Sequence, residues 1–477
     1  MSIFSKITAA VISAAIAVSI LSVPAFAKEV PFENASEAIQ NIGAGWNLGN
    51  SLDSCGEWIA LYTDNKPADY EKAWGNPVTT KKLISSVKAA GFNAVRFPVT
   101  WTDHTDQNGN IDKEWLDRVQ EIVDWIIAED MYCILNVHHD GGSDGWIEAS
   151  SAGYKANSAR FKGLWKNIAA RFKNYDEKLM FESFNEVLDK NNNWISSDSE
   201  GFEAINKYNQ LFVDTVRKTG GRNDERTLVV QTYAANGSTD AVLKNFVLPK
   251  DTVKNHLMVQ VHCYDPQGFT TKDATWTKMT DEWGSSSDKS AIDSYFKKLS
   301  GYADKWGAPV IVGEFGSQDK SNEAERAEHA GYYVSTAGKY GIKCFWWDNG
   351  AENEYKIIDR NSGKKVCSKI VNALVKNAEK STKASSDKLP AATLKGKLKD
   401  GKLTLTWNKI DGAYGYRVYK YDAKSGKYKQ IAFIKSNKKT VTGLSKGSYK
   451  FKVVAVEQKN GKNKNGESSN ALKVTIK

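Results

Sequence analysis

Cysteine is scarce in this chain: there are 5 among 477 residues, an odd and sparse set. Cys133, Cys263 and Cys344 each lie in or beside a strand-like run, where a buried free thiol is the usual outcome. A disulfide framework is therefore not expected. No Cys and His residues have the spacing of a zinc site, and no Gly-rich phosphate loop follows an early strand. We therefore expect neither a metal nor a cofactor.

Long apolar runs are also missing, except at the N-terminus. Lys6 precedes the apolar stretch 7–23, and Ala25-Phe26-Ala27 has the small-residue pattern of a cleavage site. Residues 1–27 are thus predicted to be a signal peptide, although a membrane anchor is the alternative. The mature protein would begin near Lys28, have no membrane span and be secreted, either extracellular or associated with the cell wall.

The charge is divided unevenly along the chain. Residues 388–477 hold 22 Lys and Arg against 5 Asp and Glu, a net charge of +17. Residues 28–387 hold 43 basic against 51 acidic side chains, a net charge of −8. The basic end either keeps the chain soluble or binds an anionic partner, such as a cell-wall polymer. We expect no nucleic-acid partner and a monomeric protein.

Strand-like runs alternate with helix-like ones over roughly the first 375 residues. Several runs are continuously apolar, as in parallel strands that are buried on both faces. Residues Phe161, Leu164, Trp165, Ile168 and Phe172 have helical spacing, as do Trp115, Val119, Ile122 and Ile126, and Leu83, Val87 and Ala90 before Gly91. The repeats predict a (β/α)8 TIM barrel; an open doubly wound sheet is the alternative. The predicted strands are 44–48, 94–98, 132–137, 179–184, 227–231, 257–261, 310–312 and 343–345.

The pattern changes after the barrel. Residues 377–388 are polar and without apolar periodicity, which is typical of a linker. Short alternating runs follow at 402–407, 416–421, 428–434, 449–456 and 472–476. The predicted organisation is therefore a (β/α)8 barrel domain over residues 28–376, a linker over 377–388 and a small all-β sandwich over 389–477.

Polar side chains that could take part in a reaction follow the predicted strands. Glu186 and Glu314 each come at the end of an apolar run, and a carboxylate pair is what hydrolysis of a glycosidic bond requires. Active residues of TIM barrels lie on the loops after the strands, so these side chains are expected to converge. An adjacent cation would keep a nucleophilic carboxylate ionised, and Arg96 fits this role. The remaining candidates at strand ends are His138, His139, Asn185, His262, Tyr264, Trp346 and Trp347.

Two further patterns admit competing interpretations. His138 and His139 are adjacent, and neighbouring residues on a strand point to opposite faces, which argues against a shared metal. Six tryptophans near predicted loops could form platforms for an extended sugar polymer, although several should belong to the core. They are Trp46, Trp58, Trp74, Trp101, Trp146 and Trp194.

Taken together, these motifs resemble the family 5 glycoside hydrolases, the cellulase A family, and most closely its subfamily 4 endoglucanases. The resemblance covers about residues 36–376. Its motifs are Gly45-Trp46-Asn47-Leu48-Gly49-Asn50-Ser51-Leu52-Asp53, Val95-Arg96-Phe97-Pro98, Asn136-Val137-His138-His139, Phe184-Asn185-Glu186, His262-Cys263-Tyr264, Gly313-Glu314-Phe315-Gly316 and Trp346-Trp347-Asp348-Asn349-Gly350.

The resemblance implies a retaining mechanism in which Glu186 is the acid/base and Glu314 the nucleophile. It also implies that Arg96, His138, Asn185, His262, Tyr264 and Trp347 complete the catalytic subsite, with His139 as a second histidine of the cleft. Asn47 and Asn349 resemble sugar-binding positions of the subfamily. Cys263 departs from the larger apolar residue expected between His262 and Tyr264.

The C-terminal segment resembles a fibronectin type III domain, in which Trp407, Tyr416, Leu444 and Tyr449 fit the core pattern and its tyrosine corner. We therefore predict a secreted endo-β-1,4-glucanase with a β-glucan substrate. The alternatives are a xyloglucanase or mixed-linkage glucanase that uses the same residues, and a non-catalytic polysaccharide-binding protein. The family also includes mannanases, so the motifs do not fix the sugar.

Overall fold

A computed structural model describes residues 32–142, 145–196, 199–380, 389–399, 401–410, 412–423, 425–459 and 462–476. The predicted signal peptide and residues 381–388 of the predicted linker lie outside these ranges. Within the described ranges, no helix has both the length and the hydropathy that crossing a bilayer would require.

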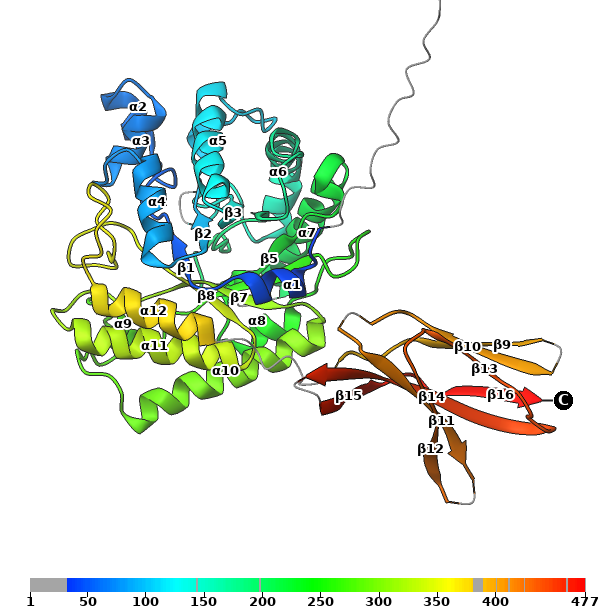
Figure 1. The fold of residues 1–477 in the computed structure, drawn as a ribbon. Helices are drawn as coiled ribbons and strands as arrows, with labels where there is room; N and C mark the ends of the chain where they lie inside the picture. The colour runs from blue at the N-terminus through cyan, green and yellow to red at the C-terminus, as the bar shows by residue number, and fades with distance from the viewer. Residues whose placement is uncertain are drawn as a thin grey trace, which may run out of the picture.

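Eight parallel strands close into a barrel in sequence order, which confirms the predicted TIM barrel (Figure 1). Every described barrel strand begins within a residue or two of its predicted start, because buried parallel strands show as apolar runs. The strands are β1 (Gly45–Asn47), β2 (Ala94–Phe97), β3 (Tyr132–Asn136), β4 (Leu179–Glu182), β5 (Leu228–Asn236), β6 (Leu257–His262), β7 (Val310–Phe315) and β8 (Lys343–Trp346).

Helices surround the barrel and bury the apolar stripes that the sequence shows. In α6, Phe161, Leu164 and Trp165 are fully buried against the strands. The helix α4 ends where Gly91 adopts a left-handed φ of 108°, as expected of a helix stop. The longer helices are α4 (Lys81–Ala90), α5 (Lys113–Ala128), α6 (Ser151–Arg171), α7 (Ser199–Arg217), α10 (Ser286–Trp306), α11 (Glu323–Lys339) and α12 (Ser368–Lys380). Shorter ones are α2 (Glu57–Tyr62), α3 (Pro67–Ala73), α8 (Asp240–Asn245), α9 (Gln267–Thr270), η1 (Thr102–His104) and η2 (Gly221–Asp224).

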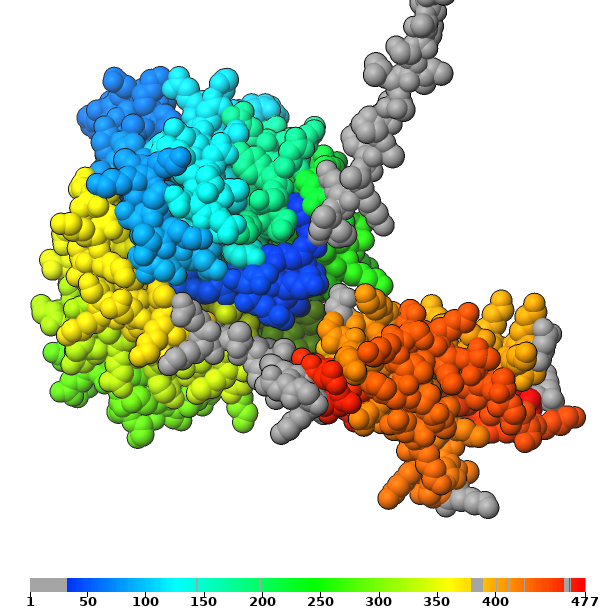
Figure 2. Space-filling model, viewed as in Figure 1, coloured from blue at the N-terminus to red at the C-terminus, as the bar shows by residue number. Residues whose placement is uncertain are grey.

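One end of the barrel is closed by α1 (Ala35–Asn41). Asn34 caps this helix, and its amide oxygen accepts hydrogen bonds from the backbone N–H groups of Ser36 and Glu37. Ala38 and Ile39 of the helix belong to the same buried cluster as residues of the barrel interior, such as Met180 and Ile311. In Figure 2 the dark blue surface around α1 lies among the cyan, green and yellow segments of the barrel. The opposite end, where the strands finish, is therefore the open one.

The segment predicted as a linker is partly helical. The helix α12 continues through Lys380, beyond the expected boundary at Asn377, and Ala378 is buried. The amide of Asn377 donates to the carbonyl oxygen of Ala373 at 2.8 Å. Polar residues alone do not end a helix, since Ala, Glu and Lys are good helix formers.

The C-terminal segment forms two antiparallel sheets over a common apolar core that includes Leu403, Leu405 and Val453. One sheet has the order β13-β10-β9, and the other has β12-β11-β14-β15 with β16 beside β14 (Figure 1). The strands are β9 (Leu394–Lys399), β10 (Lys402–Trp407), β11 (Gly415–Asp422), β12 (Lys427–Ile434), β13 (Lys438–Val441), β14 (Gly447–Lys459), β15 (Lys462–Ser468) and β16 (Leu472–Ile476). The sequence did not predict β9, β13 and β15, which are rich in Lys and Asn and poor in apolar residues.

Candidate active site

The predicted convergence of polar residues at the open end of the barrel is confirmed. Arg96 lies on β2, His262 ends β6 and Glu314 lies on β7, while Glu186 follows β4. Parallel barrel strands all finish at one rim, so residues far apart in sequence meet there.

Glu314 is held by two donors. Nη1 of Arg96 donates to Oε1 of Glu314 at 2.6 Å, and the hydroxyl of Tyr264 donates to Oε2 at 2.9 Å. Burial alone would raise the pKa of Glu314, but the nearby charges of His262 and Arg96 and these two hydrogen bonds together lower it below its ordinary value. Burial and the charge of Glu314 raise the pKa of Tyr264 well above its usual range, so Tyr264 remains a donor. Glu314 is therefore held in its ionised form.

Glu186 has a different environment. Its Oε1 lies 2.7 Å from Nδ1 of His262, and that nitrogen is 3.6 Å from Oε2 of Glu314. One carboxylate oxygen of Glu186, one of Glu314 and a ring nitrogen of His262 all lie within 4.8 Å of one another. The side chain of Glu186 is 25% exposed, whereas that of Glu314 is 7% exposed. Glu186 is thus the carboxyl group that a substrate oxygen or a water molecule can reach more easily.

The position of His262 depends on a glycine in the neighbouring strand. The side-chain amide of Gln260 contacts Nε2 of His262 at 3.2 Å, so the other ring nitrogen faces the two carboxylates. A Cβ atom on Gly313 would lie only 2.2 Å from Cδ of Gln260. Gly313 therefore has to lack a side chain for Gln260 to support the histidine.

Arg96 is oriented by a second carboxylate, Glu182 on β4, which sequence reasoning missed. Nε and Nη2 of Arg96 each donate to one oxygen of Glu182 at 2.7 Å. Asn136 and Gln231 also donate to Oε1 of Glu182, at 3.0 and 2.8 Å. A charged residue inside an apolar strand run signals a buried pair, because a carboxylate is almost never fully buried alone.

Asn185 and Asn47 both bind Arg96. The amide oxygen of Asn185 accepts from Nη2 at 2.8 Å, and that of Asn47 accepts from Nη1 at 3.0 Å. The amide nitrogen of Asn47 points to the carbonyl oxygen of Gly313 at 2.9 Å, and Asn47 is completely buried. The resemblance had implied that Asn47 binds a sugar. In the structure Asn47 instead holds Arg96 inside the barrel.

Asn349 also has partners within the protein. Its amide nitrogen donates to Oε2 of Glu354 at 2.6 Å, and its carbonyl oxygen accepts from Asn76 at 2.8 Å. Asn349 is buried, and these bonds fix the loop after β8 beside the loop that contains Asn76. Asn349 therefore supports this loop through its contacts with Glu354 and Asn76.

His138 and Trp347 form a flat pair at the floor of the site. Their rings are parallel within 3°, with centroids 5.8 Å apart. Burial, followed by the charges of His139, Arg96 and His262, lowers the pKa of His138 well below its usual range, so the ring is neutral. Trp347 is partly exposed and can stack on a sugar ring.

The prediction that His138 and His139 point to opposite faces of a strand is wrong. His138 and His139 lie beyond the end of β3, so they do not alternate as strand residues do, and their ring centroids are 4.5 Å apart. Together with Asp53 they place possible ligand atoms within 4.8 Å of one another. Those groups already serve the fold: Nδ1 of His138 accepts from Asn136 at 3.0 Å, and Asp53 accepts from the backbone of Asn50 and Ser51. The carboxylate orders this loop, and His139 lies in the cleft as predicted.

A cleft of about 560 Å³ opens beside Glu186. Trp58 and Trp194 are 46% and 56% exposed and line it together with Trp74. By contrast, Trp46 and Trp101 are fully buried and belong to the core. Trp146 is packed against the guanidinium of Arg160, whose Cζ is 4.3 Å from the ring centroid. Half of the six loop tryptophans are thus available as platforms in this cleft.

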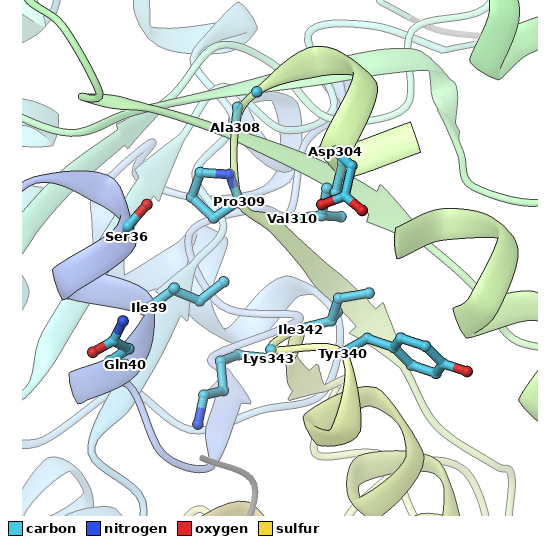
Figure 3. A pocket seen from close by; sticks show the side chains of 13 residues that line it. Ser36, Ile39, Gln40, Asp304, Ala308, Pro309, Val310, Tyr340, Ile342 and Lys343 are labelled. Atoms are coloured by element: carbon cyan, nitrogen blue, oxygen red, sulfur yellow. The ribbon is translucent and has the colours of Figure 1, made fainter. Parts of the chain in front are cut away.

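A second cavity, of about 270 Å³, lies at the closed end of the barrel (Figure 3). Ile39 of α1, Val310 at the start of β7 and Lys343 at the start of β8 line it, and Asp304 points toward it. The cavity contains one carboxylate and no partner carboxylate among its lining residues. It therefore lacks the acid pair that distinguishes the open end.

Comparisons with known proteins agree with this geometry. The family profile described as cellulase (glycosyl hydrolase family 5) matches residues 53–353. An endoglucanase A from Clostridium longisporum is 39% identical over 350 residues, which are 72% of this chain and 66% of that protein. An endoglucanase A from Ruminococcus albus is 34% identical over 363 residues, 74% of this chain and 94% of that protein. The chain spans only 40% of another relative, a cellulase/esterase from Acetivibrio thermocellus.

Solved structures show the same relationship. A broad-specificity endoglucanase from Clostridium longisporum is 37% identical with a TM-score of 0.68, over 73% of this chain and 99% of that one. A lichenase from Caldicellulosiruptor sp. F32, in complex with cellotetraose, is 38% identical with a TM-score of 0.68, over 74% of this chain and 97% of that one. These matches and the paired glutamates of the barrel lead to one conclusion: the chain belongs to glycoside hydrolase family 5, the cellulase family.

Proposed function

We propose that this chain is a secreted endo-β-1,4-glucanase that hydrolyses internal β-1,4-glucosidic bonds with retention of the anomeric configuration. The observation that carries the proposal is the unequal pair of carboxylates. Glu314 is held ionised by Arg96 and Tyr264, while the more exposed Glu186 is bound by His262. Retaining enzymes separate their carboxyl groups by about 5–5.5 Å, and the 4.8 Å limit between the carboxyl oxygens here supports the short separation.

In the first step, the carboxylate of Glu314 attacks the anomeric carbon of the bound sugar. The carboxylic acid of Glu186 gives its proton to the departing glycosidic oxygen, so that the leaving chain is a neutral alcohol. The product of this step is an ester between Glu314 and the sugar. The donors from Arg96 and Tyr264 are already in place, so they need no reorganisation as charge moves.

In the second step, Glu186 acts as a base. Its carboxylate takes a proton from a water molecule, which attacks the anomeric carbon and breaks the ester to Glu314. Two inversions at the same carbon restore the original configuration. The greater exposure of Glu186 suits this role, because the water must reach it.

Three neighbouring groups orient the sugar. The amide oxygen of Asn185 accepts from Arg96, and its amide nitrogen, which lies 3.4 Å from Nε2 of His138, carries a second N–H that can donate to a sugar 2-hydroxyl. The ring of Trp347, supported by His138, offers a stacking face. His139 lies in the cleft beside Glu186 and can donate to a further hydroxyl.

The preferred glucan is the open part of the proposal. A relative of known structure is a lichenase, and a 37% identical family 5 enzyme from Prevotella bryantii B14 was solved in complex with a xyloglucan tetradecasaccharide. A xyloglucanase or mixed-linkage glucanase is therefore the alternative. Initial rates on cellulose, xyloglucan, mixed-linkage β-glucan, xylan and mannan under one condition decide between them. We expect β-glucans with 1,4-linkages to be hydrolysed much faster than xylan or mannan.

Endo action is tested with soluble carboxymethyl cellulose. Internal cleavage lowers the viscosity steeply while few reducing ends appear, and we expect this result. The variant Glu186→Ala/Glu314→Ala is the control, which should change neither quantity. If wild-type protein bound the polymer without forming reducing ends, the non-catalytic alternative would replace this proposal.

Secretion is a separate part of the proposal. It is supported by the charged, apolar and small-residue pattern of residues 1–27. Protein recovered from the culture medium or the wall fraction should begin near Lys28 in N-terminal sequencing. Full-length protein that stays with the membrane fraction would indicate an anchor instead.

We also propose that residues 389–477 form a fibronectin type III-like domain on a monomeric enzyme. The hydroxyl of Tyr449 donates to the carbonyl oxygen of Ser445 at 3.0 Å, as a tyrosine corner requires. Light scattering of the full chain should give the mass of one copy. A mass of two copies would contradict the monomer.

A further inference from the structure

The outer face of the three-stranded sheet carries an unusual set of side chains. Pairing of β9 with β10 and of β10 with β13 places the outward residues in three rows across the sheet. They are Lys395, Thr406 and Lys438 in the first row, Lys397, Thr404 and Thr440 in the second, and Lys399 and Lys402 in the third. We call these eight residues the lysine face. It has five lysines, three threonines and no carboxylate.

This arrangement works against folding. Lys399 and Lys402 are directly opposite each other, and like charges in that position destabilise a strand pair. On β9 the lysines at alternate positions are about 6.7 Å apart, so their charges repel along the strand as well. None of the five lysines forms an ion pair with an acidic side chain in the part of the chain that the structure describes.

Lysines of the other sheet differ, because intramolecular contacts account for them. Nζ of Lys450 lies 5.3 Å from the ring centroid of Tyr421, and Nζ of Lys452 lies 4.8 Å from that of Tyr428. Lys429 pairs with Asp422. Such contacts offset the cost of gathering cations. The cations of the lysine face lack a comparable explanation within the described chain.

We propose that the lysine face binds a linear polysaccharide whose sugar rings bear carboxylates, a polyuronate. The cations lie in rows across one face of the sheet, so a polymer that crosses this face meets several charges in turn. Threonine hydroxyls between the lysines can bond the hydroxyl groups that a polyuronate also presents. The choice of a polysaccharide rests on the proposed function, since the barrel of the same chain would act on a polysaccharide.

The composition of the face predicts the character of the binding. Lysine is a hydrated point charge, unlike arginine with its planar fork, so each contact is weak and separable. Affinity should arise from several contacts at once and weaken strongly as salt rises, because exposed charges are screened. The barrel is net negative, so it should not compete with the face for the same polymer.

Binding of fully de-esterified polygalacturonate to the full chain is measured by calorimetry at two salt concentrations. The test variant is Lys395→Gln/Lys397→Gln/Lys399→Gln/Lys438→Gln. The matched control is Lys409→Gln/Lys427→Gln/Lys435→Gln/Lys446→Gln, which removes the same charge from exposed positions outside the lysine face. Methyl-esterified polygalacturonate serves as the uncharged polymer.

We expect the test variant to bind on the order of tenfold more weakly or worse, and the control variant to stay within about threefold of wild type. Equal losses in the two variants would overturn the proposal, because net charge alone would then explain binding. Equal affinity for the esterified polymer would also overturn it. So would tighter binding of polyphosphate or double-stranded DNA at the same charge concentration, or self-association of the wild type that the test variant loses.

Hydrolysis of soluble cello-oligosaccharide is followed in the same samples. It should be the same in wild type and both variants, since the lysine face contains no catalytic residue. Absence of hydrolysis in wild type would count against the proposed function of the barrel, while the binding data would still decide on the face. Circular dichroism of both variants confirms that the sheets have folded.

Discussion

Arg96 and Glu182 form a bidentate pair inside the barrel, in which Nε and Nη2 of the guanidinium each donate at 2.7 Å to one carboxylate oxygen. Neither side chain has any exposed surface. Although burial alone would lower the pKa of Arg96, the carboxylates of Glu182 and Glu314 raise it, so the guanidinium is charged. The pair fixes the plane of the guanidinium and leaves Nη1 directed at Glu314.

Glu182→Gln should therefore destabilise the fold. Breaking a buried ion pair costs about 3 kcal/mol or more, because an under-compensated charge remains inside. The free energy of unfolding is measured with urea and tryptophan fluorescence. Glu121→Gln is the control, since Glu121 pairs with Arg118 at an exposed position and should cost less than about 1 kcal/mol. If both variants lost a similar free energy of unfolding, the buried pair would contribute no more to stability than an exposed pair.

Tyr264→Phe should shift the acid limb of the pH–rate profile. The tyrosine hydroxyl stabilises ionised Glu314 and so lowers its pKa. Activity needs the ionised form and falls as the pH drops through that pKa. Removal of the hydroxyl raises the pKa, so the acid limb of kcat/KM moves to higher pH. Tyr340→Phe, at the closed end of the barrel, should leave the profile unchanged. An acid limb that stays in place in Tyr264→Phe would contradict this assignment.

Replacement of each glutamate by alanine should reduce catalytic activity in a different way. Loss of general acid catalysis in Glu186→Ala should reduce polysaccharide hydrolysis by about 10²- to 10⁴-fold. A dinitrophenyl glycoside needs no proton for departure, so it should still form the glycosyl-enzyme in this variant. Glu314→Ala should lose both activities, and added azide should restore turnover and give an azide product of inverted configuration. Exchange of the two behaviours would reverse the assignment.

Trp194→Ala should weaken the use of long substrates. Trp194 is 56% exposed in the cleft, where it can stack on a sugar beyond the reacting pair. An aromatic contact contributes about 1 kcal/mol, so kcat/KM on a long cello-oligosaccharide should fall roughly fivefold. Activity on a short chromogenic glycoside should not change. Trp276→Ala removes a tryptophan that is 72% exposed and outside the cleft lining, and is the matched control.

Much of the barrel could be predicted because its strands are buried on both faces. Runs such as 132–137 and 257–261 are mostly apolar, with one polar residue in each (Asn136 and Gln260), and the polar residues directly after them mark the open rim. Arg96, Glu186, His262, Tyr264 and Glu314 meet there as predicted. Strand ends thus indicated these candidate site residues, and the family resemblance supplied the roles that are expected of them.

Long-range pairing was not predictable in the same way. Glu182 lies within a predicted strand, but its partner Arg96 is 86 positions away in the sequence. The motif around Asn47 predicted a sugar-binding residue, yet in the closed barrel its side chain is bound to Arg96 and to the carbonyl oxygen of Gly313. The strand β9 was missed because it has few apolar side chains, only Leu394 and Leu398, and Gly396 between them is a poor strand former.

The configuration of the first product tests the central claim most directly. Hydrolysis of a β-linked cello-oligosaccharide is followed by proton NMR from the first minutes, before the released sugar mutarotates. Double displacement by Glu314 and Glu186 predicts that the β-anomer appears first and the α-anomer follows only at the rate of mutarotation. If the α-anomer appeared first, water would attack in a single displacement, and Glu314 would not be a nucleophile.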